Sequence, residues 1–103
     1  MRFLVVNKSK FPFPPEMAAP LFDAQQGWID ANMKSGKMEQ VWSLAGLQGG
    51  GGILNVDSLE ELDGILISMP LGPFSEREVY GLGDIKQALN AGKQAVAMMT
   101  KGA

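Results

Sequence analysis

Four consecutive glycines, Gly49–Gly52, interrupt the middle of the chain and restrict its fold more than any other stretch. Before them, residues 37–46 alternate between polar and apolar side chains; after them, residues 53–56 are apolar and partly β-branched, as in a strand. Glycine adopts positive φ at little steric cost, as a hairpin bend or bulge requires. We therefore predict a β-hairpin whose joint is residues 47–52. The alternation puts on one face of its first arm Met38, Trp42 and Leu44.

Apolar periodicity predicts further elements on both sides of the hairpin. They are a strand at residues 2–8, a helix at 16–35, a helix from Asp57 or Ser58 to Met69, a strand at 75–82, and a last helix from Asp84 with Ile85, Leu89, Val96 and Met99 on its inner side. Pro20 is best accommodated in a first helical turn, so we expect the first helix to start near Ala18 or Ala19. Ser58 and Glu61 form a capping-box pattern, in which each residue bonds the other's backbone amide.

This order of elements, β-α-β-β-α-β-α, predicts an α+β fold. Its first six elements match the split βαβ, or ferredoxin-like, arrangement: a four-stranded antiparallel sheet with two helices on one face. At 103 residues the chain forms a single domain, residues 1–103. Because the other face of the sheet would stay open and is apolar, we expect a homodimer in which two sheets pack face to face.

The composition excludes several classes of function. The chain has no cysteine and no histidine, which rules out disulfides, thiolate or imidazole zinc sites, cysteine nucleophiles and Ser-His-Asp triads. With nine basic and eleven acidic residues and no basic patch, nucleic acid is not an expected partner. No apolar run reaches the roughly 20 residues of a membrane span, and the apolar run in residues 1–7 is too short for a signal peptide and lacks a small-residue cleavage site. We expect a cytoplasmic protein.

Between residues 36 and 82 the chain carries a series of short motifs in a definite order and spacing. Their residues are Gly36, Trp42, Ala45, Gly46, Val56, Asp57, Ser58, Glu61, Leu62, Met69, Pro70, Leu71, Pro73, Phe74, Glu78, Val79, Gly81 and Leu82. In the order and spacing of these motifs the sequence resembles the muconolactone isomerase family, and it is similar above all to small uncharacterised relatives of that family.

The resemblance implies a ferredoxin-like dimeric α+β barrel, in some members joined into larger rings such as decamers. It implies a small-molecule pocket between the sheet and the first helix. The family reaction moves a double bond in an unsaturated lactone by proton transfer, without cofactor or metal. Members place acidic and basic residues in the middle of the first helix, and basic or imidazole residues just before the tryptophan of the second strand. Here neutral Gln25 and Gln26 stand in the helix, and Glu39 and Gln40 precede Trp42.

Two carboxylates are candidate catalytic residues. Glu39 shares a strand face with Val41 and Ser43, so it becomes a buried proton acceptor if that face lines the pocket, and an ordinary strand charge if it does not. Asp23 lies seven residues before Asp30 on one side of the first helix. One of the two aspartates could transfer a proton in the pocket, or both could be solvated surface charges.

Four further residues are candidates for substrate binding. Gln26 could donate a hydrogen bond to a ligand carbonyl, or it could be a surface amide. Trp42, Trp28 and Tyr80 could form an aromatic wall for a planar ligand, or they could belong to the core or an interface. The glycine run does not indicate a phosphate site, because phosphate-binding loops lead into a helix and this one leads into a strand.

Three functions remain open from the sequence. The first is a cofactor-free isomerase acting on a small unsaturated lactone or ring acid, with Glu39 or Asp23 moving the proton and Gln26 polarising a carbonyl. The second is a non-catalytic small-molecule-binding or assembly module of the same fold, which the neutral Gln25–Gln26 pair favours. The third is a cofactor-independent oxygenase on the same kind of barrel. A carboxylate buried beside the pocket would favour the first, and its absence the second.

Overall fold

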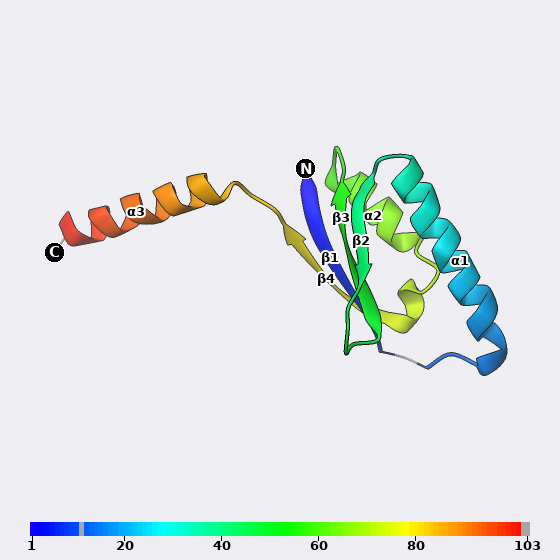
Figure 1. Ribbon diagram of the computed structural model, residues 1–103. Helices are drawn as coiled ribbons and strands as arrows, with labels where there is room; N and C mark the ends of the chain where they lie inside the picture. Colours follow the sequence, from blue (N-terminus) through cyan, green and yellow to red (C-terminus); the bar gives the residue numbers. More distant parts are fainter. Residues whose placement is uncertain (11, 102–103) are drawn as a thin grey trace.

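A computed structural model describes residues 1–10 and 12–101, without the side chain of Lys101. Along the chain its elements are β1 (Arg2–Ser9), α1 (Pro15–Lys34), β2 (Met38–Ser43), β3 (Gly49–Asn55), α2 (Leu59–Ile67), a 3₁₀ turn (Gly72–Phe74), β4 (Ser75–Gly81) and α3 (Ile85–Lys101). This is the predicted order of strands and helices (Figure 1). The last two residues of the predicted domain, Gly102 and Ala103, lie outside the described part.

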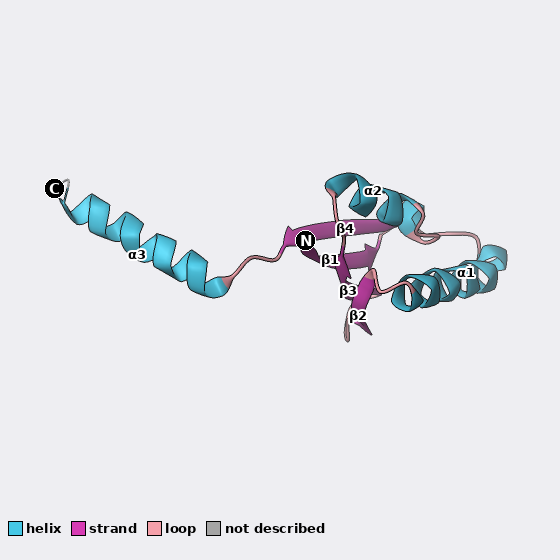
Figure 2. Cartoon of the chain, turned by 90° about the horizontal axis from the view of Figure 1, so that it is seen from above, coloured by secondary structure: helices cyan, strands magenta, loops and turns pink. Residues whose placement is uncertain are grey.

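The four strands form one antiparallel sheet in the order β2-β3-β1-β4. The apolar strand β1 and strand β3 are therefore central, and β4, whose charges alternate, is an edge strand. Helices α1 and α2 cover one face of the sheet (Figure 2). The ferredoxin-like α+β fold is confirmed. Below, the face toward α1 and α2 is the helix face, and the other is the open face.

The predicted position of the hairpin joint is wrong. Gly49–Gly52 belong to β3 and pair with β1 on one side and with β2 on the other. The chain turns earlier, between Ser43 and Gly49, where Gly46 has φ 81°. In this hairpin it is therefore Gly46, and not the glycine run, that has the positive φ that the prediction assigned to the run.

The run of glycines allows close approach of the neighbouring strands. A Cβ built on Gly52 would lie 2.9 Å from the carbonyl oxygen of Gln40, and one on Gly50 would lie 3.0 Å from that of Trp42. On the open face, a Cβ on Gly51 would lie 3.0 Å from Nε1 of the Trp42 indole. A side chain at these positions would collide with backbone atoms or displace the indole, which explains glycines inside a strand.

A β-bulge in β2 changes which side chains share a face. The pairing between β2 and β3 shifts between Met38 and Gln40, so Met38 is opposite Leu54 while Trp42 is opposite Gly51. Because cross-strand partners point to the same face and neighbours alternate, Met38 lies on the helix face and Trp42 on the open face. The single face predicted for these two residues is wrong, since the alternation breaks at the bulge.

The core lies between the sheet and α2. Its buried side chains are Val5, Met38, Leu54, Val56, Leu62, Leu66 and Met69. Helix α1 contributes no buried residue. It is joined to α2 by Trp28, whose indole Nε1 donates to Ser68 Oγ at 3.0 Å and to the carbonyl of Ile65 at 3.3 Å. This leaves a space between α1 and the sheet.

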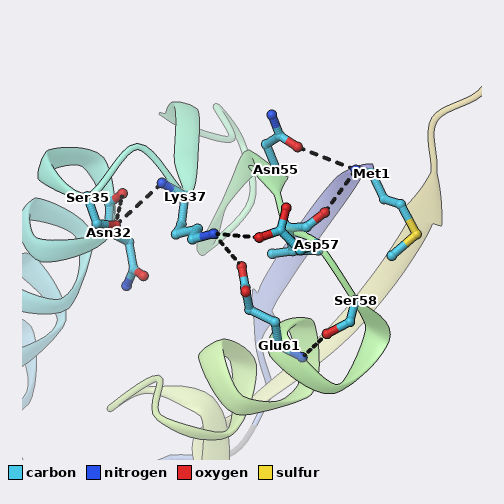
Figure 3. Close-up of polar contacts among 9 residues, drawn as sticks. Met1, Asn32, Ser35, Lys37, Asn55, Asp57, Ser58 and Glu61 are labelled. Carbon is cyan, nitrogen blue, oxygen red and sulfur yellow. Dashed lines mark hydrogen bonds and ion pairs between the residues drawn. The ribbon is translucent and has the colours of Figure 1, made fainter.

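The N-terminus of α2 is fixed by a cap and an ion-pair network. Ser58 Oγ accepts a hydrogen bond from the amide of Glu61 at 3.1 Å, which confirms half of the predicted capping box. The Glu61 carboxylate turns instead to Lys37 Nζ at 2.8 Å, and the same amine lies 3.6 Å from Asp57 (Figure 3). The hydrogen bond that the Lys37 amine donates to the Glu61 carboxylate is the main cause of the raised pKa of Lys37. The network ties the start of β2 to α2.

Both outer helices differ from their predictions. α1 begins at Pro15, which is tolerated in the first turn because its missing N–H would have no partner there. Pro20 therefore lies in the interior of the helix and not in its first turn. α3 does not turn an inner side to the core: every described residue in it is exposed, and it projects away from the sheet (Figure 1). Among the described residues, no helix is long and apolar enough to cross a membrane.

Candidate ligand cleft

A cleft of about 1130 Å³ separates α1 from the helix face of the sheet. Its floor is formed by Val5, Met38, Val41, Leu54 and by Gly50 and Gly52, which add no side chains. Trp28 and Ile29 of α1 lie on the opposite wall. The bulge and the glycines of β3 therefore shape this space, which lies where the family resemblance implies a pocket.

An aromatic cluster borders the cleft near the proline-rich loop. Phe13 makes edge-to-face contacts with Phe22 of α1 and with Phe74, at centroid distances of 5.8 and 5.4 Å. All three side chains line the cleft. Such contacts add about 0.5–1.5 kcal/mol each beyond area burial, so they hold this loop against α1. The cleft is apolar at this end.

Polar groups at the cleft are mainly neutral amides and hydroxyls. Gln25 Oε1 accepts a hydrogen bond from the amide of Leu71 at 3.2 Å, and Gln26 Nε2 donates to Asp30 at 3.0 Å. Lys10 is the cationic side chain among the described lining residues, and its Nζ lies 3.2 Å from Glu76. This set suits a ligand that carries a carbonyl, hydroxyl or carboxylate on an apolar ring.

Asn7 is a cleft residue that the sequence interpretation missed. It lies on the helix face beside Gly50 and lines the cleft. Its Oδ1 is buried, and within the described part of the chain it has no hydrogen-bond partner. Because an unpaired buried acceptor costs about 1–3 kcal/mol, Asn7 is a candidate group for holding a ligand or a water. A lone amide after four apolar strand residues was the available signal.

The predicted aromatic residues divide between the two faces. Trp28 and Trp42 are both among the residues that line the cleft, although the Trp42 side chain is directed to the open face with Gly51. Tyr80 pairs with Leu4 on the open face and is outside the described cleft lining. Gln26 and Trp28 of α1 therefore both line the cleft, whereas Tyr80 lies on the opposite face of the sheet.

The two predicted catalytic carboxylates lie outside the described lining of the cleft. Asp23 is exposed on α1. Glu39 lies at the bulge and accepts two hydrogen bonds from the Arg2 guanidinium, at 2.7 and 3.3 Å, so it joins Arg2 rather than Val41 and Ser43. The Arg2 hydrogen bond is the main cause of the lowered pKa of Glu39. A carboxylate with a lowered pKa is a weaker proton acceptor.

The titration of Tyr80 checks the geometry of the open face directly. The chain contains one tyrosine, so the ultraviolet signal of the phenol belongs to this residue. Tyr80 donates a hydrogen bond to Glu78 at 2.6 Å, and this bond to a carboxylate raises the pKa of the phenol. We expect Glu78→Gln to move the ultraviolet titration of Tyr80 to lower pH, since the neutral amide favours the phenolate more than a carboxylate does. Glu60→Gln on α2 is the matched control. Identical titrations of wild type and Glu78→Gln would contradict this geometry.

Metal binding has little support in the described part of the chain. Within it, no three histidine, cysteine, aspartate or glutamate side chains are grouped as metal ligands. The acidic residues at the sheet are instead paired with Arg2, Lys8 and Lys10. The cofactor-free reaction implied by the resemblance stays a prediction.

Comparison with known proteins agrees with this architecture. A curated relative, muconolactone Δ-isomerase 1 of Acinetobacter lwoffii, is 35% identical over 69 residues, which are 67% of this chain and 72% of that protein. A crystal structure of muconolactone isomerase superposes with a TM-score of 0.76 and 28% identity, over 82% of this chain and 90% of that one.

A second solved structure shows the same fold at greater distance. It is 5-chloro-2-hydroxyhydroquinone dehydrochlorinase from Burkholderia phenoliruptrix AC1100, in complex with 2,5-dihydroxybenzoquinone, with a TM-score of 0.66 and 15% identity over 84% of this chain and 98% of that one. The family model for muconolactone Δ-isomerase matches residues 1–88. The chain therefore belongs to the muconolactone isomerase family.

Proposed function

We propose that this protein binds a small unsaturated lactone or ring acid in the cleft between α1 and the sheet. The observation that carries the proposal is the cleft itself, with its apolar floor, its aromatic end and the buried Oδ1 of Asn7, which has no hydrogen-bond partner among the described residues. A ring would lie between Trp28 and the glycine floor. Its oxygen substituents would find the Gln26 amide and the Lys10 amine, and a ligand hydroxyl could donate to Asn7.

Binding without catalysis is the function that the geometry of one chain favours. A double-bond shift by proton transfer needs a base within hydrogen-bond reach of the substrate. The described side chains that line the cleft include neither a carboxylate nor, in this histidine-free chain, an imidazole. Among the described lining residues the amine is that of Lys10, which is ion-paired with Glu76.

Cofactor-free isomerisation is the second candidate, because a 35% identical relative is a muconolactone Δ-isomerase. In that case a carboxylate, Glu39 or Asp23, would reach the substrate only after a rearrangement, or from a second copy of the chain. Glu39 would first leave its two hydrogen bonds with Arg2.

Proton NMR with muconolactone in D2O separates the two candidates. We expect line broadening of the ligand signals by the wild-type protein, and loss of this broadening in Asn7→Leu, with no migration of the double bond and no deuterium uptake. Glu39→Gln and Asp23→Asn would test the predicted carboxylates, and Glu60→Gln on α2 is a control for removing an exposed charge.

Each outcome of this experiment decides between the candidates. Double-bond migration that Glu39→Gln or Asp23→Asn abolishes, and Glu60→Gln leaves intact, would replace binding by isomerisation. Absence of both broadening and turnover at high protein concentration would contradict a muconolactone site of either kind. Broadening that survives in Asn7→Leu would place the ligand outside the cleft proposed here.

A further inference from the structure

Arg77 is a half-buried cation for which the described residues supply no carboxylate. The other cationic side chains in or next to the sheet each form an ion pair; they are Arg2, Lys8, Lys10 and Lys37. Arg77 Nη1 donates instead to the carbonyl oxygen of Leu66 at 2.9 Å, in the last turn of α2. A charge that is partly removed from water without a counter-charge is costly, so this guanidinium is a candidate for binding an anion.

Arg77 lies directly opposite Asn7 in the sheet. The two residues are cross-strand partners on β4 and β1, and such side chains have Cβ atoms about 4.5–5.5 Å apart. Both lie on the helix face, where Arg77 bonds to α2 and Asn7 lines the cleft. Their unmet needs are opposite. Asn7 Oδ1 is a buried acceptor that lacks a donor among the described residues, whereas Arg77 is a cation that lacks an anion among them.

The cleft extends to the residues around Arg77, although Arg77 itself is outside the described lining. Asn7 opposite it, Ser75 two residues before it and Leu66 all line the cleft. A guanidinium has five N–H donors, and the hydrogen bond described for Arg77 uses one of them. Within the described part of the chain, its nitrogens are not among the buried atoms that lack a partner, so the remaining donors are accessible. A ligand beside Asn7 would therefore lie next to an accessible cation.

We propose that Asn7 and Arg77 together select a hydroxylated ring acid, which is a ring that bears both a carboxylate and a hydroxyl group. This inference rests on the proposed binding of a small ring in the cleft, and it narrows the class of ligand. The ligand hydroxyl donates to Asn7 Oδ1, and the ligand carboxylate accepts from the remaining N–H groups of Arg77. A ligand that only accepts hydrogen bonds leaves Asn7 Oδ1 unpaired, and a neutral ligand leaves Arg77 without a counter-charge.

Three benzene derivatives separate the two contacts. 3-Hydroxybenzoate carries both groups, in positions where the hydroxyl cannot bond to the ligand's own carboxylate. Benzoate lacks the hydroxyl, and 3-hydroxybenzyl alcohol lacks the charge. In NMR titrations that observe the ligand, we expect the wild-type protein to bind 3-hydroxybenzoate about tenfold more tightly than the alcohol and about fivefold more tightly than benzoate.

Each variant should change one of these two preferences. Arg77→Met should reduce the preference for the acid over the alcohol to about twofold or less, and Arg77→Lys, which keeps the charge, should retain about threefold or more. Asn7→Leu should abolish the preference for 3-hydroxybenzoate over benzoate and leave the other preference intact. Lys8→Met is the matched control, because it removes a cation next to Asn7 whose side chain lies on the open face. It should change neither preference.

A ratio of affinities distinguishes ligand binding from a structural role. If Arg77 only holds the end of α2, Arg77→Met lowers stability and leaves the ratio unchanged, which would overturn the proposal. Circular dichroism verifies the fold of each variant, and if Arg77→Met does not fold, the ratios in Arg77→Lys and Asn7→Leu decide. Wild-type protein that binds the three probes equally, or that binds muconolactone and none of them, would overturn the selection and leave the cleft as a ring site. Absence of all binding would contradict the proposed function as well.

Discussion

Replacing Gly52 with valine is expected to destabilise the protein by roughly 3 kcal/mol, the upper part of the range for overpacking a closely fitted site. The position is buried in a central strand, where β-branched residues are normally favoured. Strand propensity alone would therefore predict stabilisation. The expected loss arises because even a Cβ at Gly52 would lie 2.9 Å from the carbonyl oxygen of Gln40, a backbone atom that moves only if β2 moves.

Urea unfolding followed by tryptophan fluorescence measures this effect. Gly64→Ala is the control, because Gly64 lies in α2 with open space where its Cβ would be, and alanine there should stabilise by about 0.5–1 kcal/mol. The two glycine substitutions should thus shift the unfolding midpoint in opposite directions. A Gly52→Val protein as stable as wild type would mean that β2 and β3 do not approach each other as described.

Those glycines also show what residue patterns can predict. The order of strands and helices followed from apolar periodicity. The glycine run was ambiguous, since a bend and a close approach of strands both require a missing side chain, and only the neighbouring strands distinguish them. The β2 bulge was invisible for a similar reason: it depends on how β2 pairs with β3, and it moves every following side chain to the other face.

The same limit applies to the cleft and the last helix. Trp28 and Gln26 were predicted as possible ligand contacts, and both line the cleft. Glu39 would share a face with Val41 only if β2 were a regular strand, and the bulge between Met38 and Gln40 breaks that alternation. The apolar side of α3, with Ile85, Leu89, Val96 and Met99, was predicted to face the core of its own chain, but these side chains are exposed. An apolar helix face indicates that the helix packs against another surface, but the pattern does not show which molecule supplies that surface.

Leu54→Ala is the second substitution with a large expected effect, a loss of about 3 kcal/mol in the free energy of unfolding. Leu54 is 1% exposed and is the next-to-last residue of β3, opposite Phe3 on β1 and Met38 on β2. Leu59→Ala on α2 is the matched control, because the same atoms are removed from a side chain that is 58% exposed. That change should stay within about 0.5 kcal/mol of wild type. In thermal unfolding the buried substitution should lower Tm by roughly 12–24 °C.

The position of Leu54 also sets where in the usual range this loss should fall. Leucine-to-alanine changes in closed cores cost about 2.7–5.0 kcal/mol, and the larger values come from cavities that cannot collapse or fill. Leu54 borders the cleft, so the space left by its side chain opens toward a region that water or a ligand can enter. The transfer cost of the lost methyl groups remains, while the cavity cost is reduced. A loss near 5 kcal/mol would show that the cleft is closed at this point, and one near zero that Leu54 does not join the sheet to α2.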